Sequence, residues 1–326
     1  MIRTTFYAQQ SANRRESIAL VFVVLALLAV LGFAIGYGTS GYVESGFLVT
    51  GVALVLGLLL SIGSYFGGDK LVLATSGAKE VDAQSAPQLM NVVQEMAIAA
   101  GTPMPRVYII DDTAPNAFAT GRDPQHASVA VTTGLLQKMD REELQGVLGH
   151  ELSHVRNFDI RFALLVAVLV GSIALLADFF LRFTFWGGGR RSSSRDRGGG
   201  GGLAAVVFVI AIILAIIAPA IAALVQLAVS RQREYLADAS SVELTRNPHG
   251  LERALAKIAS DQEVLEVANR ATAHLYFTNP IKKFEARANG MFSTHPPIVD
   301  RINRLRQLTG EAPLSEADTR ALSGLD

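Results

Sequence analysis

Cysteine is absent from this chain of 326 residues, and so is a net charge, because 29 acidic residues balance 29 basic ones. Without cysteine the chain forms no disulfide, and a metal site must use histidine, aspartate or glutamate. Without a basic excess, the composition gives no sign of nucleic-acid binding. Charged residues are also scarce, at 18%, whereas hydrophobic residues make up 50% and the mean hydropathy is +0.33. Such a composition is too apolar for an ordinary soluble enzyme and favours a membrane protein.

Four apolar stretches are each long enough to cross a bilayer as a helix. They cover residues 18–38, 46–66, 162–181 and 203–229. The first two contain no charge in their cores, which favours membrane spans over buried core helices. The third and fourth leave that alternative open, because the third carries Asp178 and the fourth is longer than a span requires and contains Pro219. The first stretch also exceeds the apolar run of a cleaved signal peptide, so we expect a retained anchor.

Positive residues indicate how these stretches would be oriented in a membrane. Three arginines precede the first stretch, whereas residues 39–45 after it contain neither lysine nor arginine. The positive-inside rule therefore places the N-terminus and residues 67–161 in the cytoplasm. The Arg- and Gly-rich loop 182–202 contradicts that rule if the third and fourth stretches both span. Either this hairpin crosses against the rule or it dips in without crossing, and both alternatives leave residues 67–161 and 230–326 on one side.

The residues from His150 to His154, HELSH, carry the clearest sign of chemistry in the sequence. Residues four apart on a helix lie one above the other, so the imidazoles of His150 and His154 can reach one metal ion. Glu151 is rotated by roughly 100° from His150, close enough to take a proton from a water on that ion. Zinc catalysis requires two such nitrogen ligands, an open position for water and a carboxylate base. The sequence therefore predicts a catalytic zinc site on this segment.

The flanking sequence supports a helix at this motif. Asp140 and Glu143 form a D-x-x-E capping signature, which predicts that a helix begins at Arg141. Apolar residues then recur at helical spacing, at Leu144, Val147, Leu148, Leu152 and Val155. The alternative is a surface helix whose two histidines are satisfied by other partners, and the regular apolar face argues against it.

The expected division of the chain is an anchor at 1–66, a catalytic half at 67–161, a membrane hairpin at 162–229 and a helical catalytic half at 230–326. The first catalytic half should form a small α+β unit, with a helix over 87–100 and strands over 106–110, 116–120 and 128–132. If the last strand lies at a sheet edge, an extended substrate can pair with its main chain, at Ser128, Val129, Ala130 and Val131. An internal strand without a free edge is the alternative.

A catalytic zinc ion usually takes three protein ligands, so one more is expected. Glu234 is the best candidate, because it follows the fourth apolar stretch on a predicted helix and Asp238 follows one turn later. Asp238 can accept the far N–H of a zinc-bound histidine and so fix its tautomer. The alternative is an exposed charged patch that joins Glu234 to Arg231 and Arg233, and spacing alone leaves it open.

Several motifs together resemble the HtpX family of membrane zinc endopeptidases, which are relatives of the prenyl-protein (CAAX) proteases. They are HELSH with the following VRNFD, then a hydrophobic hairpin, then SRQREYLAD at 230–238, and also PNAFATG at 115–121, LYFTNP at 275–280 and STHPP at 293–297. The resemblance covers nearly the whole chain. It implies a mostly α membrane protein, with four apolar helices and a small α+β zincin-like catalytic domain that carries the HExxH helix.

The resemblance also implies the chemistry of the site. One zinc ion would be held by His150, His154 and Glu234, with Glu151 as the general base. The implied activity is endopeptidase cleavage of misfolded or damaged membrane proteins at the cytoplasmic face of a bacterial inner membrane. The partners would then be polypeptide substrates and the lipid bilayer, with no nucleic acid.

Three further residues complete the predicted site. Asn157, directly after the metal motif, is expected to support the ligands together with Asp238. Asn116 is expected to contact substrate. His295, in a predicted rigid turn near the metal, would donate to the developing oxyanion, unless it is only a structural turn histidine.

Functions of other classes remain as alternatives. A processing peptidase of the CAAX type would cut one specific substrate, and a catalytically silent membrane scaffold would keep the fold without the reaction. A transporter is disfavoured, because the first, second and fourth apolar stretches contain no charge that would mark a pathway.

Overall fold

The structure is a computed structural model that describes residues 6–185, 201–261, 263, 265, 276–277 and 296–323. The chain forms two compact units. One consists of Met1–Tyr65 with Leu165–Gln226, and the other of Phe66–Leu164 with Leu227–Asp326. Each unit is therefore built from two separate pieces of the chain, and the two are described in turn.

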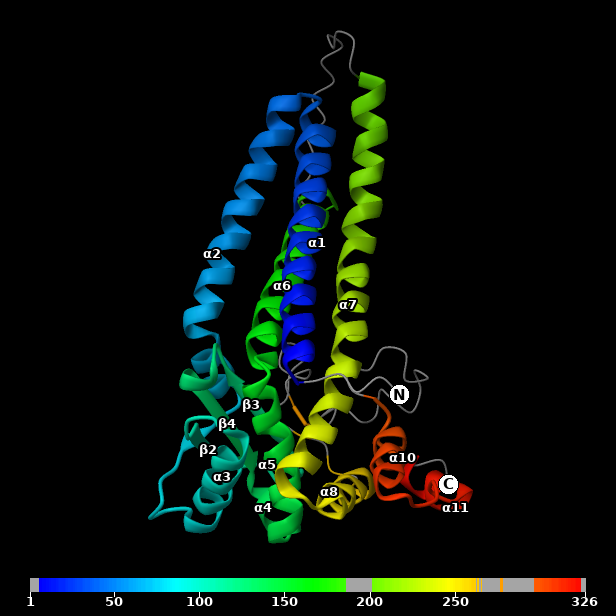
Figure 1. The fold of residues 1–326 in the computed structure, drawn as a ribbon. Coiled ribbons are helices and arrows are strands. Elements are labelled where there is room, and N and C mark those ends of the chain that lie inside the picture. Colours follow the sequence, from blue (N-terminus) through cyan, green and yellow to red (C-terminus); the bar gives the residue numbers. More distant parts are fainter. Residues whose placement is uncertain are drawn as a thin grey trace. The chain divides into compact units, whose positions relative to one another are not determined.

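Long helices make up the first unit (Figure 1). They are parts of α1 (Phe6–Ser40), α2 (Val43–Thr75), α6 (Asp159–Phe185) and α7 (Gly201–Thr245). All four predicted apolar stretches thus lie in helices. Among the described residues, two segments are long and apolar enough to cross a membrane, Phe22–Ser40 and Val43–Gly63, and α7 adds a shorter apolar segment, Ala205–Ala218. A membrane part with four spans therefore stays a prediction.

Within this unit α1 and α2 approach each other closely. A Cβ atom at Gly36 would lie 2.2 Å from the carbonyl oxygen of Ser45, so only glycine fits there. The rings of Phe33 and Phe47 meet edge to face, with 5.3 Å between their centroids. Contact through a small residue is the packing that membrane helices commonly use.

A four-stranded sheet in the order β1-β2-β4-β3 lies in the second unit. Its strands are β1 (Lys79–Glu80), β2 (Arg106–Ile110), β3 (Ala117–Gly121) and β4 (Ala127–Thr132). β2 and β4 are parallel, and the other two pairs are antiparallel. The three predicted strands are confirmed, with boundaries shifted by no more than one residue.

For β4 the structure supports the alternative of an internal strand and not the sheet edge that substrate pairing would need. β4 pairs with β2 from Ser128 to Thr132 and with β3 from Ala127 to Val131, so its main chain is engaged on both sides. Ser128, Val129, Ala130 and Val131 are all 0% exposed. The small polar residues of the strand are buried like the apolar ones, so their alternation does not mark a solvent-facing edge. An added substrate strand cannot pair with β4.

The second unit also contains the parts of α2, α6 and α7 that fall within Phe66–Leu164 and Leu227–Asp326. Further helices lie wholly within this unit. They are α3 (Pro87–Ala100), α4 (Thr133–Lys138), α5 (Arg141–Arg156), α8 (Pro248–Ser260), α10 (Ile298–Thr309) and α11 (Glu316–Ser323), with a 3₁₀ turn at Pro124–His126. The predicted start of a helix at Arg141 and the predicted helix over 87–100 are confirmed. α5 follows a complete capping box of Asp140 and Glu143, α8 follows Asn247, and α3 ends at Gly101 with φ 66°.

α5 lies at the centre of the unit's core and packs against α3, α8 and β3. Leu148 and Leu152 of α5 are 0% exposed, and each buried leucine contributes roughly 1.5–3 kcal/mol. At Gly146 the helices meet through their backbones, because a Cβ there would lie 2.7 Å from the main-chain nitrogen of Leu251. This packing fixes α5 in place and leaves its remaining face for polar side chains.

Candidate metal centre

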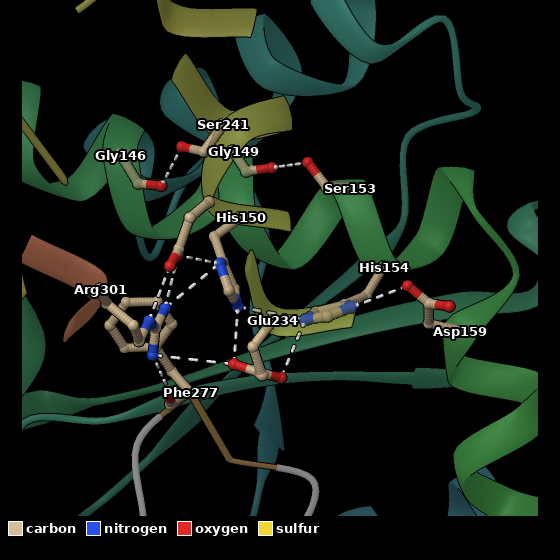
Figure 2. A network of polar contacts seen from close by, with 11 residues as sticks. Gly146, Gly149, His150, Ser153, His154, Asp159, Glu234, Ser241, Phe277 and Arg301 are labelled. Atoms are coloured by element: carbon tan, nitrogen blue, oxygen red, sulfur yellow. Dashed lines mark hydrogen bonds and ion pairs between the residues drawn. The ribbon is translucent and has the colours of Figure 1, made fainter. Parts of the chain in front are cut away.

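α5 places His150 and His154 on one face, one turn apart (Figure 2). Their rings meet edge to face with 4.7 Å between centroids, and their Nε2 atoms are 3.1 Å apart. The side chain of His150 is 1% exposed and that of His154 is 14% exposed. Both Nε2 atoms therefore face one common point, as the HExxH spacing predicts.

Glu234 reaches the same point from α7. Its two carboxylate oxygens lie 3.5 Å from Nε2 of His150 and 3.5 Å from Nε2 of His154. Glu234 is 5% exposed and Arg233 is 6% exposed, so these two residues do not form an exposed charged patch. The structure thus brings Glu234 to the two histidines, although it follows His154 by 80 positions in the sequence.

The spacing of these three groups suits a tetrahedral zinc ion. Ligand atoms at about 2.0–2.1 Å from zinc in tetrahedral geometry lie roughly 3.3–3.4 Å from one another. The observed separations of 3.1, 3.5 and 3.5 Å fall on either side of that value. Two imidazoles and one carboxylate are also a donor set that catalytic zinc sites use.

Two aspartates orient the imidazoles from behind. Nδ1 of His150 lies 2.9 Å from Asp238, and Nδ1 of His154 lies 3.1 Å from Asp159. An ionised carboxylate can only accept, so each Nδ1 carries the proton and each Nε2 presents a lone pair to the common point. Asp238 has the predicted role. Asp159 was not assigned one, although it stands in the VRNFD segment after the motif.

The sequence did not predict any role for Arg301 of α10 in the site. Its guanidinium is 0% exposed and donates to both oxygens of Asp238, at 2.9 and 2.7 Å. The pKa of Asp238 is consequently lowered, because the charge of Arg301 and the hydrogen bonds outweigh the large opposing effect of burial. A signal existed in the sequence, since Arg301 lies beside Ile302 and Leu305 on the apolar face of α10, whose apolar residues recur at helical spacing.

Glu151 also lies against the site, 2% exposed. Burial raises the pKa of its carboxyl group, while charge on His150 and His154 and the main-chain amide of Ala119 act in the opposite direction. A base with a raised pKa is suited to accept a proton near neutral pH. For His154, burial alone would lower the pKa, but Asp159 and Glu234 raise it well above its usual range.

The other predicted site residues have different surroundings. Asn157 is the C-cap of α5, where its N–H donates to the carbonyl of Ser153 at 2.9 Å. Asn116 precedes β3 and its side chain accepts from the N–H of Ala117 at 3.0 Å. His295 lies outside the described residues. The described contacts therefore give Asn157 and Asn116 structural roles.

Comparisons with known proteins agree with this geometry. The pattern described as Peptidase family M48 matches residues 83–309, which is most of the chain. A protease HtpX homolog of Streptococcus thermophilus is 48% identical over 302 residues, and one of Streptococcus mutans is 47% identical over the same length. Both alignments cover 93% of this chain and 99% of the relative.

One solved structure, Ste24p of S. mikatae, shares 14% identity with a TM-score of 0.47. The alignment covers 91% of this chain but only 66% of that one. The family match and the two bacterial relatives are therefore the informative comparisons. On their strength, the chain belongs to peptidase family M48, among its HtpX-type membrane metalloproteases.

Proposed function

We propose that this protein is a zinc-dependent endopeptidase that cuts misfolded or damaged membrane proteins at the cytoplasmic face of a bacterial inner membrane. The observation that carries the proposal is the convergence of His150, His154 and Glu234 at 3.1–3.5 Å, with buried Glu151 beside them. Each group needed for hydrolysis of a peptide bond is present, so a catalytically silent scaffold is disfavoured.

The residues would divide the reaction between them. A zinc ion bound by the three ligands would polarise the scissile carbonyl and make water acidic near neutral pH. Glu151 takes the proton from the attacking water and delivers it to the leaving nitrogen. Asp238 and Asp159 keep the two imidazoles in the tautomer whose Nε2 lone pair faces the metal position.

We infer that the substrate main chain would lie along β3, the strand at the end of the described sheet. Tyr276 and Phe277 already pair with the start of β3, where Phe277 N–H donates to the carbonyl of Ala117 at 2.7 Å, so an added strand would have to pair with the part of β3 beyond Phe118. β3 also faces the base, since the amide of Ala119 contacts the Glu151 carboxylate. An extended peptide along β3 would therefore pass Glu151 and bind mainly through main-chain hydrogen bonds. Such binding demands little of the sequence, as quality control requires.

The chemistry is tested with purified protein in detergent. Zinc is measured per chain, and casein cleavage is followed before and after removal of metal by a chelator. The proposal expects about one zinc ion per chain and cleavage that chelation abolishes and zinc restores. Cleavage that survives complete metal removal would exclude it.

The orientation is tested by labelling. Because the chain has no cysteine, single cysteines can be introduced without a background. Tyr42→Cys lies between α1 and α2 and Leu308→Cys lies on α10, at positions 69% and 60% exposed. A membrane-impermeant maleimide should label the first in intact spheroplasts and the second only after lysis. The reverse pattern would place the site outside the cell.

A further inference from the structure

We propose that Arg301 is a positioning residue for the metal centre, although it is not a ligand. It fixes Asp238 behind His150 and restrains Glu234, so it sets the affinity of the site for metal. The inference rests on the proposed zinc function of His150, His154 and Glu234. It assigns α10, which supplies no ligand, a direct part in that site.

The contacts of Arg301 define one geometry for Asp238. Nε and Nη2 of Arg301 donate to the two carboxylate oxygens, at 2.9 and 2.7 Å, in the fork arrangement that arginine alone provides. The oxygen that receives Nη2 is also the one that lies 2.9 Å from Nδ1 of His150. With both oxygens held, Asp238 cannot rotate away from His150, and the imidazole keeps its direction.

The other end of the guanidinium reaches a second ligand residue. Nη1 lies 3.7 Å from a carboxylate oxygen of Glu234, the same oxygen that lies 3.5 Å from Nε2 of His150. Nη1 also donates to the carbonyl of Phe277 at 3.1 Å. Arg301 thus contacts Asp238, the partner of His150, and lies near the carboxylate of Glu234. Because its shorter hydrogen bonds go to Asp238 and to the carbonyl of Phe277, it does not take the position of the metal on Glu234.

Aromatic packing holds the guanidinium in this position. It lies 4.7 Å above the ring of Phe277, and that ring meets the imidazole of His150 edge to face at 4.8 Å. A fully buried guanidinium would be strongly destabilising unless its partners were in place. Figure 2 shows Arg301, Asp159, Phe277 and the three ligand residues in one connected set of contacts. Because the buried charge of Arg301 is stable only with these partners in place, the packing of α10 favours the arrangement in which Asp238 and Glu234 face the site.

The test measures zinc affinity without substrate, by competition with a chromophoric chelator, on the full chain in detergent. Arg301→Met should weaken zinc binding about 10- to 100-fold, as loss of partners behind metal-bound histidines commonly does. Arg301→Lys keeps the charge but not the two parallel hydrogen bonds, so its zinc affinity should lie between that of the wild type and that of Arg301→Met. Arg304→Met is the matched control, because Arg304 lies on the same helix, is exposed and stacks on Tyr235 instead.

Two further measurements separate positioning from simple support of the fold. The visible spectrum of the cobalt-substituted protein should change in Arg301→Met and stay unchanged in Arg304→Met. The effect of Arg301→Met should also shrink markedly in an Asp238→Asn background, because both variants break one network. A role confined to holding α10 would lower the unfolding temperature of the metal-free protein and leave zinc affinity and the cobalt spectrum as they are.

The outcomes are distinguishable from those of the proposed function. If wild type binds no zinc at the ligand residues, the proposed function fails, and this inference fails with it. If wild type binds zinc and both Arg301 variants bind it equally well, only the role of Arg301 is overturned. Should Arg301→Met not fold, Arg301→Lys decides, because wild-type affinity and spectrum in that variant would contradict positioning by the fork.

Discussion

Among the residues that the structure describes, two clusters of histidine and glutamate lie in the second unit, and each brings three possible ligand atoms within 4.8 Å of one another. The inner cluster consists of His150, His154 and Glu234, and the outer cluster consists of His249, Glu252 and Glu311. An arginine stands beside each cluster. The two differ in burial and in what that arginine touches.

In the outer cluster the arginine contacts the carboxylates of the candidate ligand residues. Arg306 lies 2.9 Å from Glu252 and 3.7 Å from Glu311. His249, with 48% of its side chain exposed, lies 3.3 and 3.5 Å from the same carboxylates. A guanidinium and solvent therefore satisfy both carboxylates, and a single imidazole remains. This is a surface ion-pair network of small energetic value.

In the inner cluster Arg301 makes its close contacts with Asp238, which is not a ligand candidate, and stands 3.7 Å from Glu234. The positive charge of Arg301 thus acts on the cluster through Asp238, and the candidate ligand atoms remain available for a metal ion. Proximity of histidine and glutamate does not by itself make a metal site. The difference lies in the partners behind the ligands and in the exclusion of water.

Removal of a ligand should give the largest contrast between the clusters. Glu234→Ala is expected to reduce zinc from about one ion per chain to near zero and casein cleavage to background, because two imidazoles alone hold zinc weakly. Glu252→Ala makes the same change in the outer cluster and should leave both quantities unchanged. Elemental analysis and the casein assay provide the measurements. Zinc loss in Glu252→Ala would reverse the assignment of the two clusters.

Removal of the base should separate binding from chemistry within the inner cluster. Glu151→Gln keeps the size of the side chain but cannot take a proton, so kcat should fall about 10²–10⁴-fold while zinc content stays at the wild-type value. The measurements are peptide hydrolysis and elemental analysis of the same sample. Substantial cleavage by this variant would contradict the role given to Glu151.

The inner cluster was largely predictable from the sequence, for local reasons. A capped helix with residues four apart on one face fixes His150 and His154 almost independently of the rest of the fold. Glu234 required a non-local step, because its spacing to Asp238 left an exposed charged patch open and only the resemblance to the HtpX family assigned it to the metal. The three expected strands and the helix that begins after the Asp140 cap were predictable from local sequence for the same reason.

What escaped prediction depends on tertiary contacts. The pairing of β4 on both sides is set by β2 and β3, and residue alternation within one strand does not reveal it. Arg301 is 63 positions from Asp238, and its place beside Ile302 and Leu305 on α10 indicates burial without showing which residue it contacts. Asp159 reaches His154 because the chain turns after α5 at Phe158, which has φ 62°. A positive φ at a phenylalanine is not expected from the sequence.

A smaller effect is expected from the partner of His154. Asp159→Asn removes the charge that orients Nδ1 of His154, so zinc affinity should fall about tenfold, the low end of the range for such partners, because His154 is the more exposed of the two histidines. Glu311→Gln, which changes the partner of His249, should have no effect on zinc. Competition with a chelator measures the zinc affinity of both variants. Equal affinities in wild type and Asp159→Asn would show that this aspartate serves the fold alone.

The smallest effect concerns the helices that carry the two clusters. Asp140 caps α5 by accepting from Glu143 N–H at 2.9 Å, and Asn247 caps α8 by accepting from Gly250 N–H at 3.3 Å. Alanine at either cap should lower the free energy of unfolding by about 1 kcal/mol, measured by chemical denaturation. The local consequences differ, because His249 lies in the first turn of α8 whereas His150 lies ten residues beyond Asp140. Fraying in Asn247→Ala should shift the imidazole NMR signals of His249, while Asp140→Ala leaves zinc affinity unchanged. If Asp140→Ala weakened zinc binding as much as Asp159→Asn, the inner cluster would depend on the whole length of α5 and not on the partners behind its ligands.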